Sequence, residues 1–144
     1  MDKDNRQLPS VDYDRFFREI KTIAVVGYSD KPERAGHYVA HYMKDHGYEV
    51  IGVNPKLAPE SGGVKVYASL AEIPAGTKVD VVDVFRSPPA VPAIVEESAA
   101  LDPLPAYFFM QPGAENSDAA KLAQEKGMQP IMHACLMAAH KIWK

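Results

Sequence analysis

The chain has 144 residues, of which 47% are hydrophobic, and a formal net charge of −3 at pH 7. That length fits one domain with its own core, and the weakly acidic charge argues against a protein that binds nucleic acid or an anionic membrane through excess positive charge. No apolar run approaches the ~20 residues that span a bilayer, and the polar residues 1–10 do not resemble a secretion signal. We therefore expect a cytoplasmic protein with a flexible tail over 1–11 and a single domain over 12–144.

Strands and helices are expected to alternate along most of the chain. Helical spacing of apolar residues predicts helices over 12–21, 36–46, 87–100, 116–126 and 135–143, and Asn116 or Ser117 is expected to cap the fourth of these. Continuous β-branched or aromatic runs predict strands over 22–27, 48–53, 64–67, 79–85, 106–110 and 128–132. Ser69 is expected to cap a brief helical turn after the third strand.

This order of elements predicts an α/β fold, namely a Rossmann-like, doubly wound sheet of five to six mainly parallel strands with helices on both faces. Ligands bind such sheets beyond the carboxyl ends of the strands, near the point where the strand order reverses. The loops that follow the strands are therefore the places where binding residues are expected.

The loop after the first strand predicts a phosphate site. It begins with Gly27, Tyr28 and Ser29 and leads into a helix, so it offers backbone N–H groups and the positive end of the helix dipole. Ser29 adds a hydroxyl, and Lys31 and Arg34 add positive charge. The loop is not the G-x-G-x-x-G of dinucleotide-binding proteins, and an ordinary turn with solvated charges is the alternative interpretation.

The loop after the second strand predicts a phosphorylated ribose. Proteins that bind NAD normally carry Asp or Glu at this point to hold the ribose diol, but the chain reads Asn54-Pro55-Lys56. A lysine here suits the 3′-phosphate of coenzyme A or the 2′-phosphate of NADP. The alternative is that Lys56 simply faces water.

Two further loops supply candidate residues. The loop after the fourth strand contains Phe85, Arg86 and Ser87. Arg86 is expected to pair either with a phosphate or with Asp83. The loop after the fifth strand contains Gln111 and Gly113, and Gln111 is expected either to bond the amide groups of a pantetheine arm or to order its own loop.

Together these motifs resemble those of a known family. The combination is G-x-S-x-x-P-x-R over 27–34, V-N-P-K over 53–56, V-F-R over 84–86 and Q-x-G over 111–113. Across roughly 21–135 the chain resembles the small stand-alone coenzyme A-binding proteins, which are similar in turn to the N-terminal domain of the succinyl-CoA synthetase α subunit.

The resemblance implies coenzyme A as the cofactor. It implies that 27–29 lie against the pyrophosphate with Lys31 and Arg34 nearby, that 54–56 flank the 3′-phosphate, and that 85–87 lie near the adenine or ribose. The chain departs from the family at Tyr28, which replaces a small residue and is expected to narrow the loop. It also reads His133-Ala134-Cys135 where the family often has Asp-Arg-Cys, so no role of that Asp and Arg is carried over.

The sequence favours binding over catalysis. Cys135 stands near the start of a predicted helix, which can activate a thiol, but we expect it to be buried and inert. His37 and His41 lie four residues apart on one helix and are expected to be surface or packed residues, not zinc ligands. We therefore expect a module that binds coenzyme A or an acyl-CoA and acts as a sensor or carrier, as a homo-oligomer or beside an unidentified enzyme. The alternatives are an NADP-dependent oxidoreductase and a Rossmann scaffold that works only through protein contacts.

Overall fold

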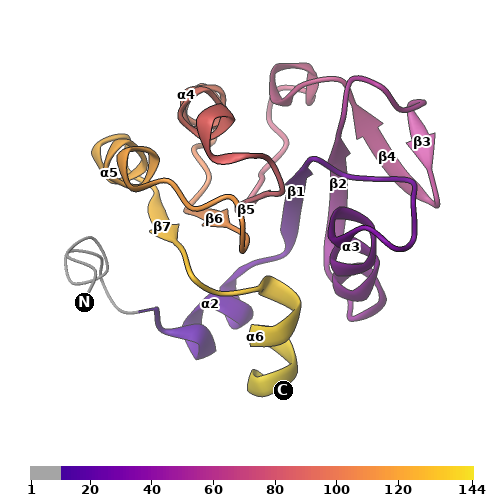
Figure 1. Ribbon diagram of the computed structural model, residues 1–144, viewed down its shortest axis with the longest axis horizontal. Coiled ribbons are helices and arrows are strands. Elements are labelled where there is room, and N and C mark those ends of the chain that lie inside the picture. The colour runs from indigo at the N-terminus through magenta and orange to yellow at the C-terminus, as the bar shows by residue number, and fades with distance from the viewer. Residues whose placement is uncertain (1–10) are drawn as a thin grey trace.

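The structure, a computed structural model, describes residues 11–144, so the tail expected over 1–11 lies almost wholly outside the described residues. A central sheet carries helices on both of its faces (Figure 1). The strands are β1 (Thr22–Val26), β2 (Glu49–Val53), β3 (Glu60–Ser61), β4 (Val64–Tyr67), β5 (Val81–Val84), β6 (Tyr107–Met110) and β7 (Gln129–Ile131). The helices are α2 (Tyr13–Glu19), α3 (Ala35–Asp45), α4 (Val91–Ala99), α5 (Ser117–Glu125) and α6 (Leu136–Trp143), with 3₁₀ turns at Leu70–Glu72 and Pro88–Ala90.

The strand order of the seven-stranded sheet is β3-β4-β2-β1-β5-β6-β7. All neighbouring strands are parallel except β3, which runs antiparallel to β4. The predicted α/β, doubly wound architecture is confirmed, and all six expected strands are present. The additional strand, β3, has only two residues, too few for any hydrophobic period. Without β3 the order is that of a dinucleotide-binding sheet, and its direction reverses between β1 and β5.

Two separate hydrophobic cores explain the apolar strand sequences. Ala24 and Val26 of β1 face the core beneath α4 and α5, whereas Ile23 and Val25 face the core that includes α2, α3 and α6. Figure 1 shows these two helical layers on opposite faces of the sheet. Because both faces of the central strands are covered, their sequences are continuously apolar and do not alternate.

One of the two expected helix caps is present. The Asn116 Oδ1 atom accepts from the Ala119 N–H at 3.0 Å, and its Nδ2 atom donates to the Pro88 carbonyl at 2.7 Å. Asn116 thus caps α5 and ties it to the segment that follows β5. The expected cap at Ser69 is wrong, because this side chain makes no capping hydrogen bond to the 3₁₀ turn. Among residues 11–144, no helix is both long and apolar enough to cross a membrane.

A carboxyl group is buried at the centre of the sheet. Asp83 of β5 is fully buried between Val25 of β1 and Phe109 of β6. Neither of its carboxyl oxygens has a hydrogen-bond partner within the described part of the chain. Burial raises the pKa of Asp83 well above its usual value. As the pH rises above the usual aspartate pKa, the unfolded chain loses a proton that the folded protein keeps, so the folded state is progressively destabilised.

The variant Asp83→Val should therefore be more stable than the wild type. It removes two unpartnered oxygens from a buried strand, and we expect a gain of about 1–3 kcal/mol in the free energy of unfolding at pH 7. Urea denaturation at pH 4 and pH 7 measures both values, and the gain should be larger at pH 7. A loss of stability at pH 7 would show that the carboxyl group has a partner in solution.

Candidate functional site

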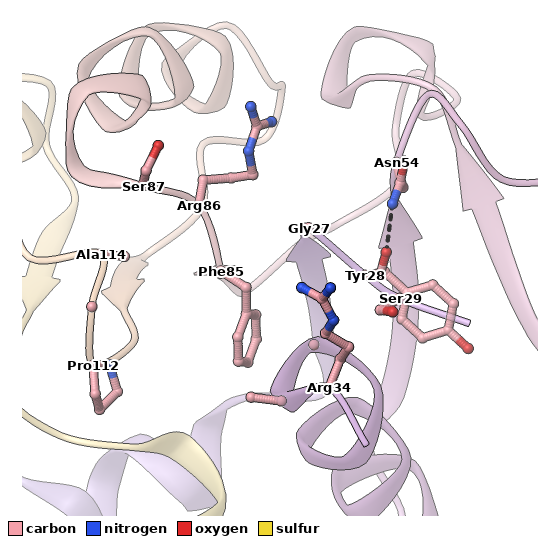
Figure 2. Close-up of a pocket in the computed structure, with 13 residues that line it drawn as sticks. Gly27, Tyr28, Ser29, Arg34, Asn54, Phe85, Arg86, Ser87, Pro112 and Ala114 are labelled. Carbon is pink, nitrogen blue, oxygen red and sulfur yellow. Dashed lines mark hydrogen bonds between the residues drawn. The ribbon is translucent and has the colours of Figure 1, made fainter. Parts of the chain in front are cut away.

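A hollow of about 470 Å³ lies beyond the carboxyl ends of β1 and β5, where the strand order reverses (Figure 2). It is lined by residues of four segments: Gly27, Tyr28, Ser29, Arg34, Ala35, Gly36, Asn54, Phe85, Arg86, Ser87, Pro112, Gly113 and Ala114. A second hollow of about 240 Å³ adds Val53, Pro55 and Lys56 and shares Gly27, Asn54 and Arg86 with the first. The shared residues join the two hollows into one extended site.

The site is basic although the chain as a whole is acidic. Arg34, Arg86 and Lys56 line the two hollows, and no lining residue within 11–144 is acidic. Figure 2 shows Arg34 and Arg86 on either side of the Gly27 turn. With a net charge of −3 for the chain, this concentration of positive charge is a local feature that favours an anionic ligand.

Unpaired backbone donors add to the positive character of the site. Gly27 adopts a φ of +92°, and its own N–H is bonded to the Val53 carbonyl. The next three N–H groups, those of Tyr28, Ser29 and Asp30, donate to no residue that the structure describes, and neither do those of Ala35 and Gly36 at the start of α3. Loop and helix N–H groups in this arrangement bind phosphate oxygens.

A close backbone contact brings these donors together. A Cβ atom at Gly36 would collide with the carbonyl oxygen of Gly27, so only glycine lets α3 approach the loop this closely. Gly27 is confined in the same way, since a Cβ there would lie 2.6 Å from the carbonyl oxygen of Phe85. Both glycines therefore set the distances between the loop, the helix and the end of β5.

The ring of Tyr28 points away from the hollow and is fully buried on the opposite side of the loop (Figure 2). It lies over Gly52 of β2, where a Cβ atom would come within 2.8 Å of the ring. Its hydroxyl donates to the Ser61 carbonyl at 2.9 Å and accepts from Nε2 of His41 at 2.8 Å. Burial, followed by the charge of Asp30, raises the pKa of Tyr28, so the hydroxyl keeps its proton. The expected narrowing of the loop by Tyr28 is therefore wrong.

Both ends of the Asn54 amide are already engaged. Its Nδ2 atom donates to the Tyr28 carbonyl at 2.8 Å, and its Oδ1 atom accepts from the Lys56 N–H at 2.9 Å (Figure 2 shows the first of these bonds). Asn54 thus connects the loop after β1 to the turn that carries Lys56. The side chain orders the site from within, while Lys56 and Pro55 remain exposed.

Similarity to known proteins identifies the family of this chain. A family model described as a coenzyme A-binding domain matches residues 21–141. The chain belongs to this family. It is 42% identical over 124 residues to the uncharacterized protein YneT of Bacillus subtilis, covering 86% of this chain and 88% of YneT. No activity is stated for YneT, so only the family assignment bears on the function of this chain.

Two solved structures of similar proteins share the fold over nearly their full length. A hypothetical protein from Pyrococcus horikoshii is 35% identical, with a TM-score of 0.84 over 92% of each chain. The Thermus thermophilus protein cell-free ID.343 is 32% identical, with a TM-score of 0.84 over 99% of this chain and 100% of its own. The fold of this chain is therefore shared by similar proteins over nearly the same extent.

Two residues expected from the family motifs do not line the site. Lys31 is exposed beyond it, and Gln111 is buried, with its Oε1 atom accepting from the Leu136 N–H at 2.9 Å. This bond supports the interpretation that Gln111 orders local structure. Arg86 lines both hollows and makes no bond to Asp83, so the expected alternative pairing of these two residues is wrong.

The remaining expected residues of the family motifs do line the two hollows: Gly27, Tyr28, Ser29, Arg34, Asn54, Pro55, Lys56, Phe85, Arg86, Ser87 and Gly113. Five lining residues were not expected from the sequence: Ala35, Gly36, Val53, Pro112 and Ala114. Two features of the sequence pointed to four of them. Two small residues come directly after Arg34, and the other two are the direct neighbours of Gly113. Cys135 is half-buried and not buried as expected, and it lines a different, mostly apolar hollow beside α6, away from the basic residues.

Substitution of Gly36 by alanine tests the close contact. Alanine normally stabilises a helix interior by about 1 kcal/mol relative to glycine, but here its Cβ would displace the Gly27 carbonyl. We expect Gly36→Ala to lower the free energy of unfolding by about 1–3 kcal/mol, as overpacking does. Thermal or urea denaturation measures the change, with the exposed Lys44→Ala on the same helix as the control. A stabilised Gly36→Ala protein would contradict the contact.

Proposed function

We propose that this protein is a binding module for coenzyme A, which occupies the two joined hollows. The observation that carries the proposal is the set of unpaired N–H groups and three basic side chains at the reversal of the strand order. Coenzyme A carries a pyrophosphate and a 3′-phosphate on one adenosine, so it presents two anionic groups to two adjacent basic hollows.

The pyrophosphate is assigned to the larger hollow. The N–H groups of Tyr28 and Ser29 and those of Ala35 and Gly36 border it, and Arg34 stands at its edge. Phosphate at a helix N-terminus gains from both the free N–H groups and the helix dipole. The guanidinium of Arg34 can add two parallel hydrogen bonds to phosphate oxygens.

The 3′-phosphate is assigned to the smaller hollow. Lys56 and Arg86 both line it, and Pro55 and Val53 supply apolar surface beside them. The absence of Asp or Glu directly after β2 supports a phosphorylated ribose over the free diol of NAD, since an acid there would repel phosphate. Lys56 thus discriminates between ligands by charge.

The pantetheine arm is assigned to the end of the larger hollow beyond β6. Phe85, Pro112 and Ala114 line that end, and they offer apolar contact. No carboxylate, histidine or cysteine lines either hollow within the described residues, which supports binding over chemistry in this site. In this proposal the protein presents or senses coenzyme A, alone, as a homo-oligomer or beside a separate enzyme.

Lys56→Ala should weaken coenzyme A more than dephospho-coenzyme A. The lost contact to the 3′-phosphate is a charge-assisted hydrogen bond on an exposed side chain, and we expect about a tenfold loss of affinity. Dephospho-coenzyme A lacks that phosphate and should be little affected. Calorimetric titration of both ligands measures this, with Lys121→Ala on the exposed face of α5 as the control. Equal losses for both ligands would remove Lys56 from the 3′-phosphate site.

Coenzyme A should raise the thermal midpoint of this protein, and NAD should not. A ligand at 100 times its dissociation constant adds about 2.7 kcal/mol to the free energy of unfolding. In a domain of this size each kcal/mol shifts the midpoint by about 2–4 °C, so we expect a shift of about 5–10 °C. Melting curves with coenzyme A, acetyl-coenzyme A, NAD and NADP measure it. A shift with NADP alone would favour an oxidoreductase, and no shift with any ligand would contradict cofactor binding.

A further inference from the structure

The first three carbonyl groups of the loop after β1 lie against other parts of the protein. The Gly27 carbonyl lies against Gly36 of α3. The Tyr28 carbonyl accepts from Asn54, as described above. The Ser29 carbonyl accepts from Nδ1 of His37 at 2.8 Å. The Gly27 carbonyl is thus packed against α3 and the next two are held by hydrogen bonds, while the three N–H groups that follow them in the chain have no partner within residues 11–144.

Peptide geometry connects these two facts. In a planar trans peptide the C=O of one residue and the N–H of the next point in opposite directions. A partner that holds the Ser29 carbonyl on the α3 side therefore turns the Asp30 N–H away from α3. If that peptide rotated, the backbone of Ser29 would move with it, and the N–H group of Ser29 borders the larger hollow.

The His37 ring is itself fixed in place. Because a carbonyl oxygen can only accept, Nδ1 of His37 carries the proton in this bond. The ring stacks on that of His41 with centroids 4.0 Å apart, and Nε2 of His41 is bonded to the hydroxyl of Tyr28. Burial, followed by the proximity of His37, lowers the pKa of His41, which keeps this neighbour neutral. His37 is half-buried, is the third residue of α3 and does not line either hollow.

We infer that His37 is a positioning residue of the coenzyme A site: its Nδ1–H group holds the Ser29 carbonyl and thereby fixes the loop whose Tyr28 and Ser29 N–H groups border the larger hollow. The inference rests on the proposed function, because it concerns the same loop. His37 acts through Ser29 and makes no contact with the ligand.

Three variants test this inference by calorimetric titration with coenzyme A and dephospho-coenzyme A. His37→Ala removes the donor and should weaken both ligands about tenfold and equally, because both contain the pyrophosphate. His37→Asn keeps an N–H donor at the position of Nδ1 and should restore affinity to within about threefold of the wild type. His46→Ala removes a similar bond, from its Nδ1 to the Tyr42 carbonyl at the other end of α3, and should leave affinity unchanged.

Several outcomes would overturn the assignment. One is an unchanged affinity of His37→Ala in a protein whose wild type binds coenzyme A. Another is a His37→Asn variant no better than His37→Ala, which would mean that the ring and not the donor matters. A selective loss of coenzyme A over dephospho-coenzyme A would place the effect at the 3′-phosphate. Circular dichroism of each variant checks that the fold is retained.

A measurement without ligand separates this inference from the proposed function. Long-range ¹H–¹⁵N correlation spectra of the ligand-free protein report which ring nitrogen of a neutral histidine carries the proton. We expect Nδ1 for His37, and the Nε2 tautomer would refute the bond to Ser29. A wild-type protein with the Nδ1 tautomer that binds no coenzyme A would contradict the proposed function and leave His37 as a support of the loop alone.

Discussion

The site depends on the direct backbone contact between the first turn of α3 and the loop after β1. Gly36 makes this contact possible, because a Cβ atom there would meet the Gly27 carbonyl oxygen, and Gly27 in turn lets the loop lie close to the Phe85 carbonyl. The contact places the free N–H groups of a helix beside those of a loop, and the backbone holds both sets rigidly. The exposed side chains of Arg34 and Arg86 add charge to a framework of donors that is already in position. Such preorganised dipoles lose little freedom when a ligand binds.

Much of this arrangement was predictable from the sequence because of one property of parallel sheets. Strands covered on both faces are continuously apolar, so their limits stand out, and their carboxyl ends all lie at one edge. The motifs that begin at Gly27, Asn54 and Phe85 are far apart in the chain, and the fold brings them to the same hollows. The direction of a side chain within a loop was less predictable. Gln111 follows β6 as expected, but its side-chain Oε1 atom accepts from the N–H of Leu136, 25 residues further along the chain.

The residues that were misjudged have partners that no local pattern indicates. The Tyr28 ring is accommodated because β2 carries Gly52 beneath it and because Ser61 of the two-residue strand β3 accepts its hydroxyl. His37 was expected to be a surface or packed helical residue, and only the folded loop gives it a carbonyl to bind. Asp83 was considered as a partner of Arg86, but the alternation of side chains along β5 directs it into the core instead.

The amide of Asn54 has a consequence for how this site can change during evolution or by design. One side chain is bonded both to the loop after β1 and to the turn of Lys56. A substitution that reshapes the Lys56 turn to accept a different ribose will therefore also disturb the loop that faces the pyrophosphate. The loop after β1 and the Lys56 turn are therefore structurally coupled. A new nucleotide preference requires compensating changes in both segments.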